Sequence, residues 1–151
     1  TRIDLVQPMY NLVKRQAEVE ILPMAIDQDI AVAPYSPLGG GLLSGKYASG
    51  DTGRLTENKM YAARYSPDWM HETAKSLSKL AEEHRVHPAT FAVAWVARHP
   101  GVTAPIISAR SVAQLAPSLA AANFQMEDSL YDKISAISFT PPPATDRLEE
   151  A

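Results

Sequence analysis

The residues most able to do chemistry lie within positions 31–47, which read AVAPYSPLGGGLLSGKY. Tyr35 directly follows a short apolar segment, so its ring could lie against a flat ligand or fill the core as a half-buried tyrosine. The glycine run 39–41 lets the backbone approach a ligand and offers N–H groups to anions, although many surface loops carry such runs. Lys46 reaches a phosphate only if the loop folds back, and otherwise points to solvent. The stretch therefore predicts a ligand-binding loop at the end of a strand.

A second candidate is Arg110, which stands directly before a helix predicted to begin after Ser111. Ser111 and Gln114 have the spacing of a capping box, in which each side chain bonds the backbone N–H of the other residue. A helix N-terminus attracts anions, and a neighbouring guanidinium can bind phosphate through two parallel hydrogen bonds. Arg110 could instead pair with a nearby carboxylate. The junction therefore indicates either a phosphate site or an ordinary ion pair.

Short apolar segments precede these candidates and are predicted to be strands, at residues 3–6, 30–33 and 103–107. Pro8 ends the first one because proline cannot donate to a ladder, which leaves Gln7 at its carboxyl end. Helical periodicity is found over residues 14–28, 68–84, 88–98, 112–122 and 127–137. Strands that alternate with helices pair in parallel, so their carboxyl ends share one rim. That rim is predicted to hold Gln7, Tyr35, Ser36 and residues 108–110. Such a set favours a phosphorylated, partly aromatic ligand.

The remaining segments carry less regular patterns. Residues 47–67 lack periodicity and are predicted to form a long irregular excursion, which in a compact domain is usually functional or mobile. Pro23 interrupts the pattern of residues 14–28 and is expected to offset its first turns. We expect one domain over residues 1–139 and a disordered tail over residues 140–151. Because a core strand is predicted from Ile3 onward, we expect the chain to begin within a longer fold.

The composition is that of a globular protein and argues against several functional classes. Of the 151 residues, 46% are hydrophobic and 21% are charged, which is enough apolar material for a sizeable core. The net charge of −3, without any basic run, argues against nucleic acid or a membrane surface as a partner. No apolar run approaches the roughly 18 residues of a membrane span, and the absence of cysteine excludes disulfides and thiolate metal sites. We therefore expect a cytoplasmic protein.

The histidines do not support catalysis. All of them lie on or between the two middle helices, away from the predicted rim: His71, His84, His87 and His99. The spacing of His84 and His87 is only weakly typical of a metal site, and we expect structural or solvated roles and no bound metal. The sequence also contains no Ser–His–Asp order and no HExxH, GxSxG or Walker pattern.

Longer segments resemble the C-terminal half of an aldo-keto reductase: VQPMYNLVKRQAE, APYSPLGGGLLSGKY and FAVAWVARHPGVTAPIISARSVAQL. The likeness runs from Ile3 to about Phe139, and SPLGGGLLSGKY is especially similar to the branch with bacterial general-stress reductases and potassium-channel β subunits. The resemblance implies an α/β fold, the C-terminal portion of a (β/α)8 TIM barrel, with three parallel strands and flanking helices, incomplete on its own. It also implies NADPH as the cofactor for reducing aldehydes or ketones to alcohols, without metal.

The resemblance implies cofactor-binding roles for residues of the rim. Gln7 matches the glutamine that bonds the nicotinamide carboxamide, and Tyr35 matches the aromatic residue that stacks on the nicotinamide ring. The loop that cradles the pyrophosphate corresponds to Ser36, Pro37, Leu38, Gly40 and Gly41. Lys46 matches a cofactor-contacting lysine, and Arg54 matches a loop arginine that clasps the cofactor.

The segment that holds the adenosine 2′-phosphate corresponds to Ser108, Ala109, Arg110 and Gln114. Ser108 stands where this branch usually has glycine, which tightens the approach of the phosphate. Family members commonly continue with a Glu-Asn pair that faces the adenine, whereas this chain has Pro117 and Ser118 there. Ser118 completes the predicted cofactor-binding set.

The resemblance also implies what this chain lacks. The family's catalytic Asp, Tyr, Lys and His lie in the first four barrel strands, so no catalytic residue is predicted here. Hydride transfer needs a proton donor at the carbonyl oxygen, so the chain alone is predicted to be inactive, with a small carbonyl substrate only when the missing half is present. Three strands cannot close a barrel, and two copies could pair through the open edges as a homo-oligomer. The alternative is a nucleotide-sensing or assembly partner without catalysis.

Overall fold

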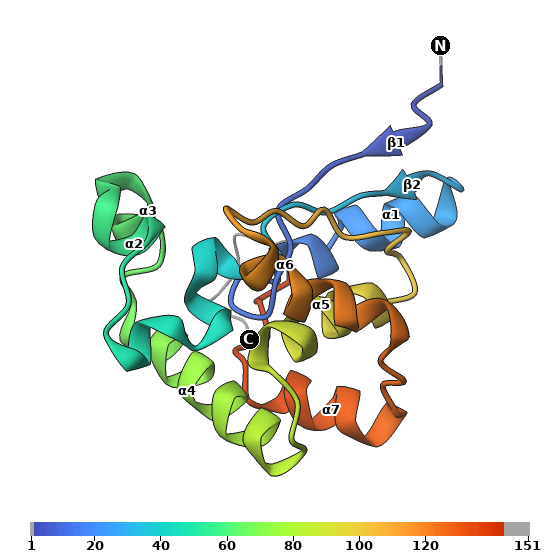
Figure 1. Cartoon of the computed structure of the whole chain (residues 1–151). Coiled ribbons are helices and arrows are strands. Elements are labelled where there is room, and N and C mark those ends of the chain that lie inside the picture. Colours follow the sequence, from blue (N-terminus) through green and yellow to red (C-terminus); the bar gives the residue numbers. More distant parts are fainter. Residues whose placement is uncertain (1, 144–151) are drawn as a thin grey trace.

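A small parallel sheet lies at one edge of the fold in a computed structural model that describes residues 2–143 (Figure 1). Strand β1 (Leu5–Val6) pairs with β2 (Ala31–Val32) in parallel, with Leu5 opposite Ala31 and Val6 opposite Val32. The pairing continues beyond the strands as single bridges, from Tyr35 to Met9 on one side and to Ile106 on the other. The predicted parallel α/β arrangement is therefore present.

The third predicted strand, at residues 103–107, is reduced to the bridge at Ile106. The backbone N–H groups of Thr103 and Ala104 both donate to Val32 O, and Ile106 N donates to Pro34 O. Pro34 and Pro105 have no N–H to add to this ladder, which limits its regular length. The segment still runs alongside β2, so the order of the three chain segments agrees with the prediction although a strand does not form.

Helices make up most of the described chain. The α-helices are α1 (Ile21–Asp27), α2 (Arg54–Glu57), α3 (Lys59–Arg64), α4 (Asp68–Glu83), α5 (Pro88–Arg98), α6 (Val112–Leu119) and α7 (Asp128–Ala136). The 3-10 turns are η1 (Gln16–Glu18), η2 (Gly39–Ser44), η3 (Lys46–Ser49) and η4 (Ala120–Asn123). The predictions for α4, α5 and α7 are confirmed to within two residues at each end. None of the helices within residues 2–143 has the length and apolar character needed to cross a membrane.

Elsewhere the helical predictions need correction. The helix predicted over residues 14–28 begins only at Ile21, because Pro23 has no N–H and is tolerated only in a first turn. The helix predicted over residues 112–122 ends at Leu119 and continues as η4. The excursion at residues 47–67 contains α2, α3 and part of η3, so it is not irregular. Residues 140–143 have no regular structure, and the rest of the predicted tail, residues 144–151, lies outside the described residues.

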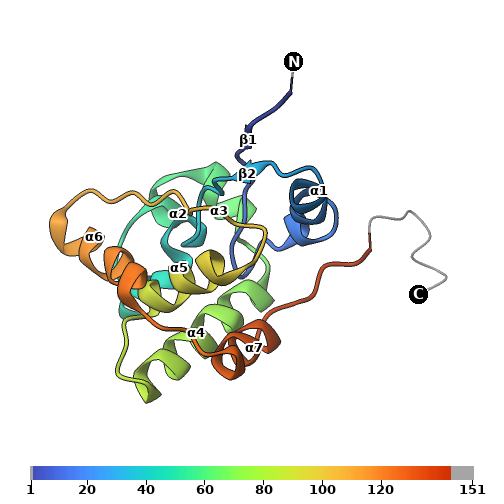
Figure 2. The same cartoon turned by 90° about the vertical axis from the view of Figure 1, so that its right-hand side faces the viewer.

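Helix α5 is the core of the molecule. Its residues from Ala89 to Val96 are all buried, and α4, α6, α7, η2 and η4 pack around it. Figures 1 and 2 place the strands on one side of α5, with α4 and α7 on the other. This packing explains why α5 is apolar on every face, as a central helix must be.

The sheet has one covered face and one open face. Val32 is fully buried beneath the helices, and Val6 packs against the same core. The pairing register puts Leu5, Tyr35 and Ile106 on the opposite face, because paired residues in parallel strands point to the same side. Their exposed fractions are 52%, 39% and 40%, respectively. We call these three side chains the open face. Parallel sheets are normally covered on both faces, so this face is unusual.

Candidate functional site

Tyr35 lies at the centre of the rim, between its two neighbouring segments. Its backbone N–H donates to Pro8 O at 3.0 Å, and its carbonyl accepts from Tyr10 N at 3.3 Å. The bridge to Ile106 fixes the other side. Tyr35 is 39% exposed, although its backbone is anchored on both sides. The predicted meeting of the three segments at one rim is confirmed for the backbone.

The turn after Tyr35 is built from residues with left-handed backbone. Ser36 has φ +63°, followed by the glycine run 39–41 with φ values of +57°, +67° and +96°. Gly39 N donates to Ser36 O at 2.9 Å, and Gly41 N donates to Leu38 O at 3.0 Å. Two of the N–H groups expected to be available for anions are therefore used within the turn. Gly40 is needed for a second reason, because a Cβ there would lie 2.9 Å from the Tyr61 ring.

The excursion folds back over the glycine run. Tyr47 Oη donates to Gly40 O at 3.1 Å and accepts from Leu55 N at 3.2 Å. Lys46 Nζ donates to Thr52 O at 3.2 Å and lies 4.8 Å from the centre of the Tyr47 ring. Lys46 thus contacts the excursion, and its role toward a phosphate stays a prediction. The excursion thus closes one side of the rim.

On the opposite side, the start of α6 carries Arg110. Ser111 Oγ accepts from Gln114 N at 3.3 Å, but Gln114 Oε1 accepts from Arg110 N at 3.2 Å rather than from Ser111 N. The predicted capping box is therefore only half formed. The Arg110 guanidinium pairs with Glu57 Oε2 at 3.1 Å, with side chains 70% and 46% exposed. Of the two interpretations of Arg110, the pair with a carboxylate is the one present. Such an exposed pair is worth only about 0.2–1 kcal/mol, so a phosphate could displace Glu57.

The other predicted site residues differ in accessibility. Exposed side chains are those of Gln7, Arg54, Ser108, Ala109 and Gln114, whereas Ser36, Leu38, Gly41 and Lys46 are partly buried and Pro37 and Gly40 are buried. The Arg54 guanidinium lies 5.6 Å from the centre of the Tyr61 ring, on the excursion. Ser118 is only 3% exposed, so its side chain is not accessible to a ligand at the rim. The prediction for Ser118 therefore needs correction, because Ser118 lies on the side of α6 that packs against α5.

The histidines have structural contacts, as expected. His87 Nδ1 accepts from Ala89 N and His99 Nδ1 accepts from Gly101 N, both at 3.0 Å, and each bond caps a turn. Burial lowers the pKa of His87 and of His99, which favours the neutral ring that such an acceptor requires. Among the described residues, no group of three or more histidine or acidic side chains could hold a metal ion.

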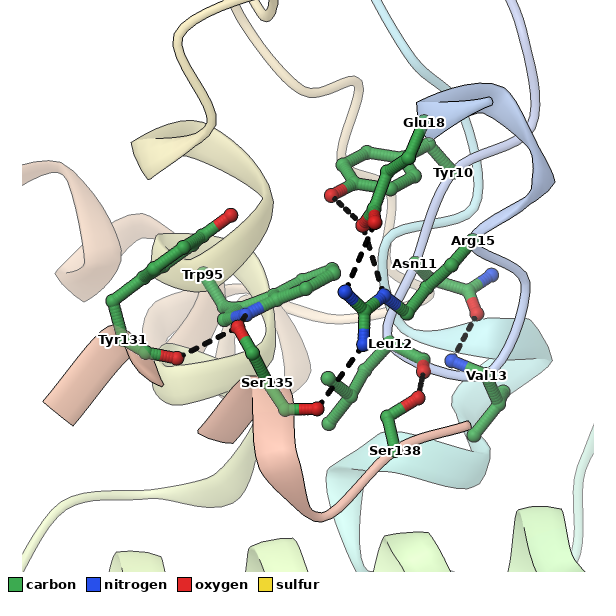
Figure 3. A network of polar contacts seen from close by, with 10 residues as sticks. All are labelled: Tyr10, Asn11, Leu12, Val13, Arg15, Glu18, Trp95, Tyr131, Ser135 and Ser138. Atoms are coloured by element: carbon green, nitrogen blue, oxygen red, sulfur yellow. Dashed lines mark hydrogen bonds and ion pairs between the residues drawn. The ribbon is translucent and has the colours of Figure 1, made fainter. Parts of the chain in front are cut away.

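A polar network that the sequence analysis missed anchors the segment after β1 (Figure 3). Tyr10 Oη donates to Glu18 Oε1 at 2.6 Å, and Arg15 donates two bonds of 2.9 Å to the same carboxylate. Arg15 also donates to Ser135 O at 3.1 Å, and Trp95 Nε1 donates to Ser135 Oγ at 2.9 Å. Burial and the Glu18 charge raise the pKa of Tyr10 well above its usual value. The only signal in the sequence is the helical spacing of Arg15 and Glu18, which does not reveal the contact with α7.

Comparison with known proteins shows the family of the chain. The model of the Aldo/keto reductase family matches residues 1–138. An uncharacterized oxidoreductase of Bacillus subtilis, YrpG, is 34% identical over 87% of this chain and 39% of its own length. A probable voltage-gated potassium channel subunit beta of rice, Oryza sativa, is 33% identical over 96% of this chain and 48% of its own. An NADH-specific methylglyoxal reductase of Escherichia coli is 27% identical over 84% of this chain and 39% of its own.

The matches cover less than half the length of these relatives, but nearly all of this chain. The family match extends from the first residue through α7 and includes every segment that forms the rim. The chain therefore belongs to the aldo/keto reductase family.

Proposed function

We propose that this chain is the NADPH-binding, C-terminal part of a (β/α)8 barrel that, when complete, reduces an aldehyde or ketone to the alcohol. The observation that carries the proposal is the Tyr35 ring, which is accessible at the rim while the backbone on both sides of it is bonded to neighbouring segments. An aromatic ring held in this way suits the flat nicotinamide, because stacking requires an orientation fixed before binding. The relatives named as an oxidoreductase and a methylglyoxal reductase support carbonyl reduction.

The residues around Tyr35 fit the rest of a dinucleotide. Gln7, at the end of the neighbouring segment, would bond the nicotinamide carboxamide. The pyrophosphate would lie along the loop formed by Ser36, Pro37, Leu38, Gly40 and Gly41, within reach of Lys46 and Arg54. The glycines of this loop permit its left-handed backbone and leave room for the excursion, because a Cβ at Gly40 or Gly41 would lie 2.9 Å from Tyr61 or Lys46.

The choice between NADPH and NADH depends on the segment Ser108–Gln114. Arg110 is exposed beside the N-terminus of α6, where a guanidinium and the helix dipole both favour a 2′-phosphate. Ser108 and Ala109 precede it, and Gln114 fixes the Arg110 backbone. One relative is named as NADH-specific, so the family's cofactors do not decide this point, and the charge of Arg110 is our reason for proposing NADPH.

The bound cofactor supplies the hydride, and the residues of this chain bind it and orient it. Protonation of the carbonyl oxygen requires an acid, which we place on the part of the barrel outside this chain. In the complete barrel, Leu5 and Ile106 of the open face would point toward the remaining strands, whereas the Tyr35 ring at the rim would stay accessible to the cofactor. We therefore propose that the chain alone binds NADPH and does not turn over a carbonyl substrate.

Titration of the chain with NADPH tests the proposal, with the fluorescence of the reduced nicotinamide as the signal and NADH as the comparison. Tyr35→Ala should weaken NADPH binding by about tenfold, the loss expected for one stacked ring. Trp69→Ala is the matched control, because Trp69 on α4 is also aromatic and also 39% exposed. Equal affinities of the Tyr35→Ala and Trp69→Ala variants, or no binding by the unaltered chain, would contradict the proposal. Oxidation of NADPH by the chain with a generic aldehyde would contradict the predicted inactivity.

A further inference from the structure

Asn11 is a fully buried polar side chain at the base of the rim, and the cofactor assignments do not use it. Its Oδ1 accepts from Val13 N at 3.0 Å, which closes a tight turn (Figure 3). Because this bond orients the amide, Nδ2 faces the loop after β2 and donates to Ser36 O at 2.9 Å. Nδ2 also lies 3.5 Å from Tyr65 Oη, at the end of the excursion. One carboxamide thus contacts both segments that form the glycine-rich side of the rim.

The bond to Ser36 lies where the backbone most needs support. Ser36 is the only residue in this turn, other than glycines, with left-handed backbone. A side chain in that region costs about 1–2 kcal/mol, so the conformation must be held by its surroundings. Ser36 O accepts from Gly39 N as well as from Asn11 Nδ2, both at 2.9 Å. Asp29 and Arg85 also have positive φ, but both lie on exposed turns.

Tyr10, the residue before Asn11, bonds Tyr35, the residue before Ser36. Tyr10 N donates to Tyr35 O, and Asn11 Nδ2 donates to Ser36 O, so two successive carbonyls are bonded by two successive residues. Tyr10 is itself fixed by its bond to Glu18 and by its ring contact with Trp95, whose centre is 5.3 Å away. The frame that holds Tyr35 and Ser36 therefore extends into the core at α5.

We propose that Asn11 is a positioning residue for the cofactor: its carboxamide holds Ser36 in the left-handed conformation and thereby sets the direction of the Tyr35 ring and the start of the glycine run. The part that concerns the cofactor rests on the proposed function. The part that concerns the loop is independent of any ligand. If Asn11 had a purely structural role, its replacement would instead destabilise the whole core, and the loop and α5 would lose protection equally.

Hydrogen exchange measured by mass spectrometry separates these two roles in the chain without cofactor. In Asn11→Ala, the Gly39 amide, which donates to Ser36 O, should exchange about tenfold faster, the effect expected for one lost buried hydrogen bond. The amides of α5 should keep their protection, because the core is unchanged. NADPH affinity should fall by a similar factor.

Further variants make the test specific. Asn11→Asp retains the acceptor for Val13 N but removes the donor to Ser36 O, so it should behave as Asn11→Ala does. The matched control is Asn58→Asp, because Asn58 uses only its Oδ1, which accepts from Met60 N and Tyr61 N. Adding Ser36→Gly to Asn11→Ala should restore much of the protection at Gly39, since glycine adopts left-handed backbone without support.

Other results would contradict either the positioning of Ser36 by Asn11 or its relevance to the cofactor. Equal loss of protection in the loop and in α5, failure of both Asn11 variants to fold, or no rescue by Ser36→Gly would overturn the positioning role. Loss of loop protection with unchanged NADPH affinity would overturn its relevance to the cofactor. If the unaltered chain binds no NADPH, the proposed function fails, and the exchange of Gly39 still decides whether Asn11 holds Ser36.

Discussion

Arg110 Nη2 lies 3.1 Å from Glu57 Oε2, and this ion pair joins the two sides of the rim. Glu57 is the last residue of α2, on the excursion that folds over the glycine run, and Arg110 stands at the start of α6. The pair therefore closes the exposed end of the proposed cofactor site. Its two residues are 53 positions apart in the sequence. It also occupies the guanidinium that we propose for the 2′-phosphate.

Removal of Glu57 should strengthen NADPH binding. In Glu57→Gln, the Arg110 guanidinium no longer has to leave a carboxylate, and the affinity should rise about two- to fivefold at low salt, as expected for an exposed pair. The gain should diminish as salt screens the charges, and NADH, which has no 2′-phosphate, should be unaffected. Fluorescence titration with both cofactors measures this. Glu72→Gln, at an exposed pair with Lys75 on α4, is the control, and an equal gain there would contradict the prediction.

Removal of the Glu18 charge should destabilise the chain strongly. The side chains of Arg15 and Glu18 are only 11% and 18% exposed, so Glu18→Gln leaves a largely buried guanidinium without its counter-charge. The free energy of unfolding should fall by about 3 kcal/mol, as for other broken buried pairs. Urea denaturation followed by circular dichroism measures the loss. Glu72→Gln serves again as the exposed reference and should change stability by less than about 0.5 kcal/mol. Similar losses in the two variants would show that the buried network contributes little.

Stability should decrease as the pH falls below about 6.5. Burial lowers the pKa of His87 and of His99 from 6.5 in the folded chain, so the unfolded chain binds more protons in this range. The contribution of these two histidines to the free energy of unfolding is therefore fully present above their pKa in the unfolded chain. It is lost as the pH falls below that pKa and through the lower pKa of the folded chain. The variant with both His87→Asn and His99→Asn retains an acceptor at each turn but cannot titrate, so its decline should be smaller. Urea midpoints at about pH 7.5 and about pH 5.5 test this, and equal declines would refute it.

Self-association should depend on the open face. Leu5 and Ile106 are 52% and 40% exposed on a sheet face that the described part of the chain leaves uncovered, and exposed apolar patches promote contact between copies. We expect light scattering to show concentration-dependent association, which Leu5→Lys should reduce. Leu119→Lys is the matched control, because Leu119 is 54% exposed but lies on α6. A monomer at all concentrations, or equal effects of the two variants, would contradict this role of the open face.

Local patterns in the sequence determined the helices that form the core and the order of the segments at the rim. The apolar spacing of α4, α5 and α7 and the proline signals at Pro8 and Pro88 act over a few residues, so they can be recognised without knowing the partners. The position of Tyr35 at the end of β2 follows from the same kind of signal. These features were sufficient to place Gln7, Tyr35 and Ser108 at one rim.

Only the tertiary structure decided which contacts those residues make. The burial of Ser118, the pairing of Arg110 with Glu57 and the bond from Asn11 to Ser36 join residues far apart in the sequence. Such contacts depend on how helices and loops pack, and no periodicity or spacing encodes them. The bridge at Ile106 shows the same limit, because residues 103–107 have strand character but Pro105, and Pro34 in the segment beside them, limit the pairing to one bridge. Residue types thus predicted a dinucleotide for the rim, whereas packing determined which of its side chains are exposed.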